Sequence, residues 1–428
     1  MIARLRTLVA GYDRRLWTLF VVQMIVSAGF GAAMPFVSLY FYRVLGVPMR
    51  IVGTIMLVSA GVSAAGRIIG GELSDRLGRR PLIASTLGIR TLLFLGMAGL
   101  VYIKANYLVL ALIFLLVRFA GAVSQPALSA MVADIVPAAR RVEAFGVLRI
   151  GGNAGWAIGP ALGGFLISIS YSLLFVLTAA ATGIGMVLIL LFTTESIKTR
   201  ETERFVLRQV LAAGRDRKFL LFCLFSLSLF LVMGQFASTL SVFSTTIVGI
   251  TDVQLGFLYT LNGIVVVLLQ WPAARVARRV GIRRALIAGS LFFAGGYFFV
   301  GLAHSYAILL LLMIVITTGE VLFSPSATTA VANMSPPDRT GRYMGFFGLA
   351  ESLGWSAGPF IGGFLFDAFA HTPMILWGSI AGLGLIAAAG FAVTGDRGPG
   401  IDMPGDSLYT GRHDDEAKGD SCPHEFDH

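Results

Sequence analysis

Long apolar blocks, interrupted by short charged or Gly/Pro-rich breaks, cover almost the whole chain. Blocks such as LVLALIFLLVRFAGAV and ALIAGSLFFAGGYFFVGLA are each close to the ~20 apolar residues that a helix needs to cross a bilayer. Cutting the chain at the breaks predicts about twelve helical spans, several of them long enough to be tilted. Their expected ranges are 16–43, 50–76, 82–103, 107–134, 142–168, 171–194, 218–247, 253–277, 285–304, 306–333, 342–369 and 373–395.

Composition supports this interpretation and excludes a soluble globular protein. The 428 residues are 56% hydrophobic and 13% charged, with a mean hydropathy of +0.81. Soluble domains are about 45–50% apolar and about 25% charged. The first block lacks a small-residue cleavage site, so we expect a retained helix rather than a signal peptide. The two cysteines lie far apart in the sequence, and no disulfide framework is expected. The predicted fold class is an all-α integral membrane protein.

Basic residues set the expected orientation in the membrane. The net charge is +10, and most of the 33 lysines and arginines fall in the N-terminal segment, in alternate loops and in the C-terminal tail. Because short cytoplasmic loops of membrane proteins are enriched in Lys and Arg, we expect these loops and both termini in the cytoplasm. The same bias explains the positive charge without a nucleic-acid partner. The expected location is the cell (inner or plasma) membrane, which the chain crosses many times.

The chain repeats itself at an offset of 199 residues. GNAGWAIGPALGGFL begins at Gly152 and ESLGWSAGPFIGGFL begins at Glu351, and Pro126 and Pro325 obey the same shift. A duplicated six-span unit is typical of one large group of secondary transporters. The expected parts are an N-terminal six-helix half at 1–194, a cytoplasmic amphipathic linker at 195–217, a C-terminal six-helix half at 218–395 and a disordered cytoplasmic tail at 396–428.

Both copies of the repeat carry glycines at four-residue spacing and a proline. Such spacing lets two membrane helices approach closely, and a proline inside a helix lacks an amide donor and favours a bend. We expect these residues to serve helix packing and hinge geometry at the interface between the halves. They are Gly146, Gly155, Gly159, Pro160 and Gly163 in the first copy, and Gly345, Gly354, Gly358, Pro359 and Gly362 in the second.

The loop after the second span, GELSDRLGRR, resembles the signature loop G-x-L-x-D-R-x-G-R-R of the major facilitator superfamily. The matching residues are Gly71, Leu73, Asp75, Arg76, Gly78, Arg79 and Arg80. The resemblance extends over residues 10–395 and implies the fold of that superfamily, in which one half rocks against the other during transport. The glycine pattern of the fifth span is similar to the motif of its proton-driven exporters, which favours a drug/proton antiporter.

The signature loop is expected to act as a cytoplasmic latch. Asp75 can accept hydrogen bonds from arginines and from the N-terminus of the eleventh span, which begins near Gly341 on the same side. Asp134, at the inner end of the fourth span, is a second expected partner of the arginines. We expect the latch to close in the outward-facing state and to break in the inward-facing state.

Charges inside the predicted spans indicate functional positions, because a charge at the bilayer centre costs ~2.5–3.5 kcal/mol on insertion scales. The resemblance implies that the first, fourth, seventh and tenth helices line a central cavity. We therefore expect Glu320 and Arg118 to face this cavity from opposite halves. Burial favours a protonated carboxyl group, and a nearby arginine favours a charged one, so the pair suits a proton-coupling site.

A second set of buried charges predicts a gate between the halves. Glu351 lies about ten residues into the eleventh span, and Arg67 lies at a similar depth in the second. Family architecture packs these two helices together, so we expect a pair of Glu351 with Arg67 or, alternatively, with Arg149 of the fifth span. The sequence reveals no partner for Arg90 in the third span.

The first and seventh spans supply the expected lining of the cavity. Many drug/proton exporters of the superfamily carry a carboxylate in the first helix, whereas this chain has Gln23 there. Aromatic and methionine side chains suit apolar, variable ligands, so Phe30, Met34 and Phe230 are expected to contact the substrate.

The predicted function is secondary active transport, with proton-coupled efflux of small lipophilic compounds or drugs by alternating access, as in multidrug resistance. Two alternatives remain: a metabolite or nutrient importer or facilitator, and a non-transporting receptor or scaffold on the same fold. No catalytic constellation is present, since no histidine lies deep in a span. We expect no enzyme activity, no cofactor and no metal. The expected partners are a small-molecule substrate, protons and the lipid bilayer, and the expected state is a monomer.

Overall fold

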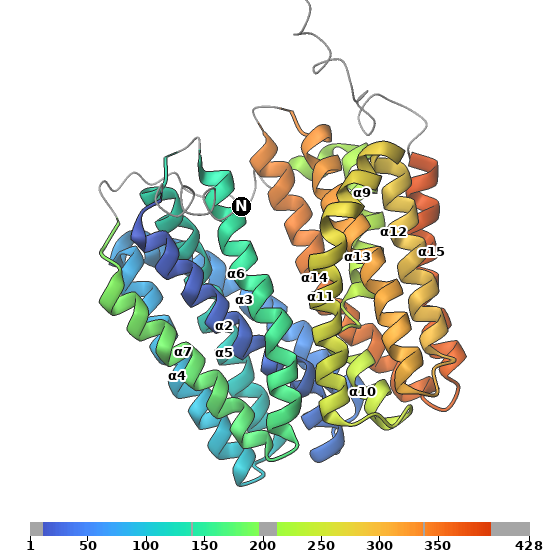
Figure 1. Ribbon diagram of the computed structural model, residues 1–428, viewed down its shortest axis with the longest axis horizontal. Coiled ribbons are helices and arrows are strands. Elements are labelled where there is room, and N and C mark those ends of the chain that lie inside the picture. Colours follow the sequence, from blue (N-terminus) through green and yellow to red (C-terminus); the bar gives the residue numbers. More distant parts are fainter. Residues whose placement is uncertain (1–11, 138–139, 197–211, 337–338, 395–428) are drawn as a thin grey trace, which may run out of the picture.

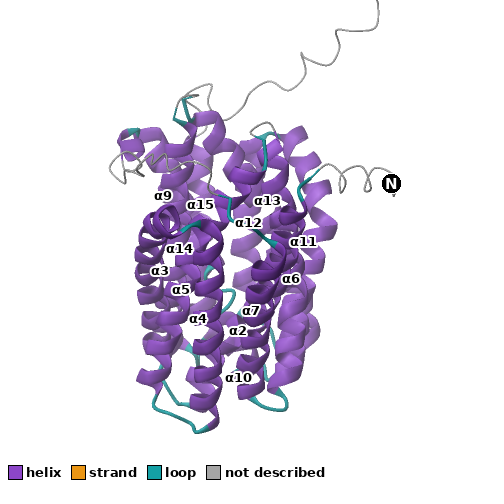
Figure 2. Ribbon diagram, turned by 90° about the vertical axis from the view of Figure 1, so that its left-hand side faces the viewer, coloured by secondary structure: helices purple, strands orange, loops and turns teal. Residues whose placement is uncertain are grey.

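The chain folds into long helices that run roughly side by side (Figures 1 and 2). A computed structural model describes the chain apart from residues 1–11, 138–139, 197–211, 337–338 and 395–428. In the described residues the elements are helices joined by loops and turns, without strands (Figure 2). Among the described residues, eight helices are long and apolar enough to cross a membrane by length and composition alone. Most of the predicted linker and all of the predicted tail lie outside the described residues.

Six long helices make up the N-terminal half. They are α2 (Arg14–Leu39), α3 (Met49–Leu77), α4 (Arg79–Tyr102), α5 (Tyr107–Ile135), α6 (Arg141–Ile167) and α7 (Tyr171–Phe192), with a π-helical turn η1 (Tyr40–Val44) that extends α2. α2 packs against α6 and α7, and α4 packs against α5 and α7. These helices form one bundle, coloured blue to green in Figure 1.

The C-terminal half repeats this arrangement. It contains a 3₁₀ turn η3 (Ala212–Arg215) and the helices α9 (Arg217–Met233), α10 (Thr239–Thr246), α11 (Asp252–Val280), α12 (Ile282–Val300), α13 (Tyr306–Met334), α14 (Thr340–Phe369) and α15 (Pro373–Thr394). The offset of the sequence repeat recurs in the structure, because α13 and α14 begin 199 residues after α5 and α6. The predicted all-α membrane fold with two pseudo-symmetric six-helix halves is confirmed, with α9 and α10 counted as one span.

The prediction of a continuous seventh span at 218–247 is wrong. α9 ends at Met233 and α10 begins at Thr239, so the span is broken over five residues. The side chain of Gln235 stabilises the break, because its Nε2 donates to the carbonyl of Gly358 at 2.7 Å and its Oε1 accepts from the Thr239 hydroxyl at 2.7 Å. Irregular backbone at membrane depth is tolerated where such groups satisfy it.

Small polar residues fix where several helices start. The side chains of Asn106, Ser170 and Ser305 each accept a backbone N–H at the start of the helix that follows. Such N-caps satisfy one of the free amide donors of the first turn and stabilise a helix by about 1 kcal/mol. They separate consecutive spans with turns of only a few residues, which keeps neighbouring helices antiparallel.

The two halves meet along two pairs of helices. α3 packs against α14 and α6 packs against α11, whereas the other extensive contacts join helices of the same half. In Figure 1 the halves converge at the lower end and diverge toward the upper end. The upper end carries the helix starts at Arg79, Arg141 and Arg217, and we call it the arginine-rich end. The lower end is called the arginine-poor end.

Candidate functional site

A cavity of about 330 Å³ lies between the two halves. Its N-terminal wall is α6, which contributes Arg149, Asn153 and Trp156. Its C-terminal wall comes from the end of α9 and the break that follows it, and from α11, α12, α13 and α14. Most of the lining is apolar or aromatic, with a few polar side chains, which is the usual character of a small-molecule site.

Glu320 lies at the midpoint of α13 and lines this cavity. The Nδ2 of Asn262 on α11 donates to the Oε2 of Glu320 at 3.1 Å and also to the hydroxyl of Thr317 at 2.9 Å. Thr317 in turn donates to the carbonyl of Met313, one turn earlier in α13. This chain of hydrogen bonds fixes one carboxylate oxygen of Glu320 against α11. Glu320 is the one carboxylate among the described residues of the cavity wall.

Arg149 supplies the cation of the same cavity. It lies eight residues after the start of α6, about 12 Å along the helix axis. It lines the cavity together with Glu320, and its charge also acts on Glu351. One arginine of the N-terminal half therefore influences two carboxylates of the opposite half.

The structure does not form the expected pair of Glu320 with Arg118. The Arg118 guanidinium lies over the ring of Phe30, with its Cζ 5.6 Å from the ring centroid. Within the described part of the chain, no ion pair joins it to Glu320. Arg149, and not Arg118, lines the cavity together with Glu320.

In place of the second predicted pair, Glu351 with Arg67, the structure has a contact between Arg67 and the residue that follows Glu351. Nη1 of Arg67 on α3 donates to the hydroxyl of Ser352 on α14 at 3.4 Å. The carboxylate of Glu351 is exposed, and the charges of Arg149 and Arg67 both act on it. Arg67, Arg149 and Glu351 thus lie at the interface between the halves, without an ion pair between them in the described residues.

Polar contacts join the halves at the arginine-poor end. The carboxylate of Asp367, near the end of α14, accepts the backbone N–H groups of Met49 at 2.9 Å and of Arg50 at 3.0 Å. These are free donors of the first turn of α3, so Asp367 caps a helix of the opposite half. Nε of Arg50 lies 3.9 Å from the same carboxylate.

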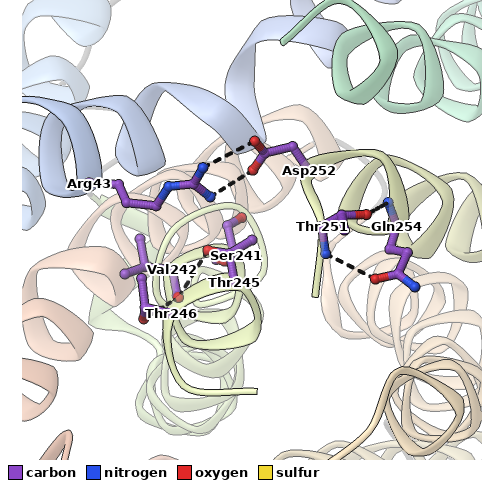
Figure 3. Close-up of polar contacts among 8 residues, drawn as sticks. All are labelled: Arg43, Ser241, Val242, Thr245, Thr246, Thr251, Asp252 and Gln254. Atoms are coloured by element: carbon purple, nitrogen blue, oxygen red, sulfur yellow. Dashed lines mark hydrogen bonds and ion pairs between the residues drawn. The ribbon is translucent and has the colours of Figure 1, made fainter. Parts of the chain in front are cut away.

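A second ion pair crosses the halves at this end (Figure 3). The guanidinium of Arg43, in the π turn after α2, donates from Nη1 and Nη2 to the two oxygens of Asp252 at 2.9 and 3.3 Å. Asp252 is the first residue of α11, and Thr251 and Gln254 form a capping box around it. The bidentate geometry fixes the start of α11 against the end of α2.

The signature loop is engaged within its own half. Arg79 pairs with Asp75, and its Nε lies 3.5 Å from Asp134. Gly78 separates α3 from α4 with φ of +102°, which a residue with a side chain rarely adopts. Glu195 was missed by the sequence interpretation: its carboxylate accepts the backbone N–H groups of Arg79 and Arg80, both at 3.1 Å, and so caps α4.

The other residues of this loop also bind nearby groups. Arg76 pairs with Glu72 one turn earlier in α3. Nη2 of Arg80 donates to the carbonyl of Leu190 at 2.6 Å. Gly71 has open space around its Cα, so close packing does not explain this glycine.

Comparison with known proteins identifies the family. The sequence matches the Major Facilitator Superfamily over residues 19–251 and again over residues 220–402. The chain belongs to the Major Facilitator Superfamily. The multidrug resistance protein MdtH of Cronobacter sakazakii (strain ATCC BAA-894) is 28% identical over 379 residues, which cover 86% of this chain and 90% of MdtH. YttB, an uncharacterised MFS-type transporter of Bacillus subtilis (strain 168), is 28% identical over 370 residues, which cover 85% of this chain and 91% of YttB.

Solved structures of transporters share the fold. The nucleoside transporter NupG superimposes with a TM-score of 0.75 over 90% of this chain and 99% of NupG, at 15% identity. A bacterial homologue of the human lysosomal transporter Spinster, in an inward-facing and occupied conformation, gives a TM-score of 0.73 over 89% and 96% of the two chains, also at 15% identity. This superfamily member is a multi-pass membrane transporter and not an enzyme.

Of the expected cavity residues of this superfamily member, Glu320 lines the cavity, whereas the aromatic lining comes from other residues than expected. Phe30 packs edge-on against Trp156 at 6.2 Å, so Trp156 rather than Phe30 reaches the cavity wall. Phe230 is buried against Phe323 and Phe347. The sequence signal that was missed is the presence of amides within apolar spans, as for Asn262.

Two further predicted residues lie away from the cavity wall. Gln23 donates from Nε2 to the Ser27 hydroxyl at 3.1 Å, within α2. Met34 packs against the hydrophobic core. From the seventh span, Met233 and Phe236 beside the helix break line the cavity instead.

The glycine rows of the repeat pack within each half, and not between the halves as expected. Cβ atoms added at the glycines of the first row would meet α2, and those added at the second row would meet α9 or the break that follows it. Pro160 and Pro359 lie inside α6 and α14. The residues that pack in this way are Gly155, Gly159 and Gly163 of α6 and Gly354, Gly358 and Gly362 of α14. Gly146 differs, because a Cβ added there would meet open space. Gly345 lies nearer the start of α14.

Other glycines form the contact between the halves at the arginine-poor end. A Cβ on Gly363 of α14 would lie 2.7 Å from the carbonyl carbon of Met49, and one on Gly164 of α6 would lie 3.2 Å from the Cα of Gly256 in α11. A Cβ on Gly53 of α3 would lie 2.7 Å from the Cα of Phe360. Backbone therefore meets backbone at both helix pairs, which only residues without a side chain permit.

Proposed function

We propose that this transporter exports small lipophilic compounds in exchange for protons, by alternating access. The observation that carries the proposal is Glu320, a mid-membrane carboxylate that lines an apolar cavity between the halves. The curated relative MdtH is named a multidrug resistance protein. A carboxylate in such a cavity can bind either a proton or the cationic group of a ligand, so the two compete for one site.

Arg149 gives this competition a structural basis. When Glu320 is charged, the nearby guanidinium of Arg149 stabilises the charge; when Glu320 is protonated, Arg149 is free to act on Glu351. Both acids belong to the C-terminal half and Arg149 belongs to the N-terminal half. Protonation of Glu320 therefore changes an attraction between the halves, which is what coupling of protons to rocking requires.

We infer that the arginine-rich end faces the cytoplasm and that the structure is inward-open. The distribution of Lys and Arg supports the orientation, with both termini inside the cell. The conformation is supported by the capping of α3 by Asp367 and by the Arg43–Asp252 pair, which join the halves at the opposite end. The pairing of Asp75 with Arg79 in its own half suits an open latch. We propose a monomer in the cell membrane as the working unit.

Transport by purified protein in liposomes tests the proposal. Tetraphenylphosphonium serves as a lipophilic cation, with valinomycin and equal potassium on both sides to remove the membrane potential. An acidic lumen should drive accumulation by the wild type. Glu320→Gln should abolish gradient-driven accumulation but retain exchange of labelled for unlabelled probe. The matched control is Glu72→Gln, which removes an exposed acid that pairs only with Arg76 of its own helix, and it should transport normally.

The same assay decides between the alternatives. Gradient-driven accumulation that survives in Glu320→Gln would contradict the assigned proton site. Flux of a metabolite or nutrient that ignores the pH gradient would favour an importer or facilitator, in line with the nucleoside transporter NupG as a structural neighbour. A complete lack of flux across a panel of substrates would favour a receptor or scaffold on the same fold.

A further inference from the structure

Two arginines remain without a counter-charge inside the N-terminal half. Arg90 on α4 is only 7% exposed, and Arg118 lies on the neighbouring helix α5. The Nε atoms of both are buried and have no hydrogen-bond partner among the described residues. Arginine stays charged in proteins, so it cannot escape the cost of burial by losing its proton.

Arg90 approaches α5 one helical turn from Arg118. A Cβ on Gly121 would lie 3.6 Å from Cζ of Arg90, and Gly121 is one helical turn after Arg118 on the same face of α5. The glycine leaves space for the Arg90 guanidinium against the α5 backbone. Two like charges thereby lie on neighbouring parts of α4 and α5, which is unfavourable unless an anion joins them.

No carboxylate of the N-terminal half reaches this place in the described structure. Its acids lie at the arginine-rich end, where they cap helices or pair with other groups, and they are Asp13, Glu72, Asp75, Asp134, Glu143 and Glu195. Asp134, on the same helix as Arg118, is sixteen residues away, or about 24 Å along the axis. Glu320 of the opposite half is held by Asn262 and acts with Arg149.

The arginines lie directly behind the wall of the central cavity. Trp156 lines the cavity, the ring of Phe30 packs on Trp156 at 6.2 Å, and Arg118 lies over the other side of Phe30 at 5.6 Å. Phe30 is therefore the ring between the cavity wall and Arg118 along this line of contacts.

We propose that Arg90 and Arg118 form an anion-binding subsite that takes the carboxylate, sulfonate or phosphate group of an amphiphilic ligand. The subsite deepens the proposed function, on which it rests, by extending its substrate class to lipophilic anions and zwitterions. The apolar part of the ligand lies in the central cavity, where a cationic group, if present, faces Glu320. Planar guanidinium groups suit oxyanions because they donate two parallel hydrogen bonds.

The test is a binding measurement in uncharged detergent, without any gradient, so that it stands apart from proton-driven transport. The probes are 4-biphenylcarboxylate and its neutral analogue 4-biphenylcarboxamide. Wild-type protein should bind the carboxylate about 10-fold to 100-fold more tightly than the amide, as expected for hydrogen bonds to a charged group. Arg90→Met and Arg118→Gln should each remove this preference, and Arg278→Gln, an exposed arginine at the end of α11, should retain it.

Thermal unfolding separates loss of the site from loss of the fold. Because Arg90→Met removes an unpaired buried charge, its midpoint without ligand should equal or exceed that of the wild type. The carboxylate should raise the midpoints of the wild type and of Arg278→Gln, but not those of Arg90→Met and Arg118→Gln. If phosphatidylglycerol stabilises the wild type with the same dependence on Arg90, the anion comes from lipid and the site stands. Equal binding of carboxylate and amide, or a preference that survives in both arginine variants, would overturn the proposal.

Discussion

Replacing Asp367 with asparagine should shift the transporter from the conformation described here toward the one open at the arginine-poor end. Each carboxylate oxygen accepts one backbone N–H of α3, at 2.9 and 3.0 Å, from the opposite half. Asparagine keeps one acceptor oxygen and replaces the other with an NH₂ group, which cannot accept. One amide of the α3 N-terminus therefore loses its partner, and the negative charge that favours this helix end is lost.

The magnitude follows from these contacts. A hydrogen bond to a charged group contributes about 1.5–3 kcal/mol, and the helix dipole adds about 0.3–1 kcal/mol. The carboxylate is 22% exposed, so water replaces part of the lost interaction. We therefore take the lower end, about 1.5 kcal/mol, which changes the ratio of the two conformations about tenfold.

Distances between spin labels measure this ratio. One pair of labels joins the exposed residues Lys104 and His304 at the arginine-poor end, and the other joins Leu77 and Val280 at the arginine-rich end. The native Cys223 and Cys422 are replaced by serine beforehand. Asp367→Asn should increase the population with the long distance in the first pair and the population with the short distance in the second.

A matched control distinguishes gating from general loss of a helix cap. Asp216→Asn removes a carboxylate that accepts from the backbone N–H groups of Lys218 and Phe219 in its own half, at 3.0 and 3.3 Å. It should leave both distance distributions unchanged. The reasoning is refuted if Asp367→Asn leaves them unchanged too, or if it shifts them in the direction of greater closure at the arginine-poor end.

Two further predictions concern the contacts between the halves, and a third concerns the signature loop. Arg43→Asp and Asp252→Arg should each reduce transport severalfold, and the double exchange should restore part of the transport. A double variant that transports no better than either single variant would show that the bidentate pair is dispensable. Gly53→Leu should reduce transport more than tenfold while the protein still inserts, because no side chain fits against Phe360, whereas Gly61→Leu on the same helix, with open space around it, should transport normally. Asp75→Asn should slow transport without altering expression if the latch operates, and unchanged rates would exclude it.

The large-scale architecture was predictable because each of its signals is local. Apolar blocks of about 20 residues predict spans whatever surrounds them, and the 199-residue offset predicts two matching halves, as the starts of α5 and α13 confirm. The break in the seventh span was not predictable in this way. It depends on Gln235, whose side chain donates to Gly358, 123 residues further along the chain.

The sequence predicts how far along its helix each charged residue of the candidate site lies, but not toward which side of the helix its side chain points. Counting residues places Glu320, Arg118 and Arg149 at the level of the cavity, but it does not say which face of a helix turns inward. The glycine rows show the same limit: their spacing indicates a face that packs closely, and only the fold shows that this face meets α2 or α9. The capping of Met49 by Asp367 joins residues 318 apart in sequence.

At the arginine-poor end, main-chain contacts join the halves alongside the Arg43–Asp252 pair. Gly53, Gly164 and Gly363 bring backbone against backbone, and Asp367 binds amide groups that every residue except proline carries. The cavity wall, by contrast, is built from side chains such as Trp156 and Asn262. Apolar residues of the wall can therefore change without altering these main-chain contacts. Glu320 and Arg149 belong to the same wall and, in the proposed mechanism, serve both binding and coupling, so a new specificity is best engineered around them.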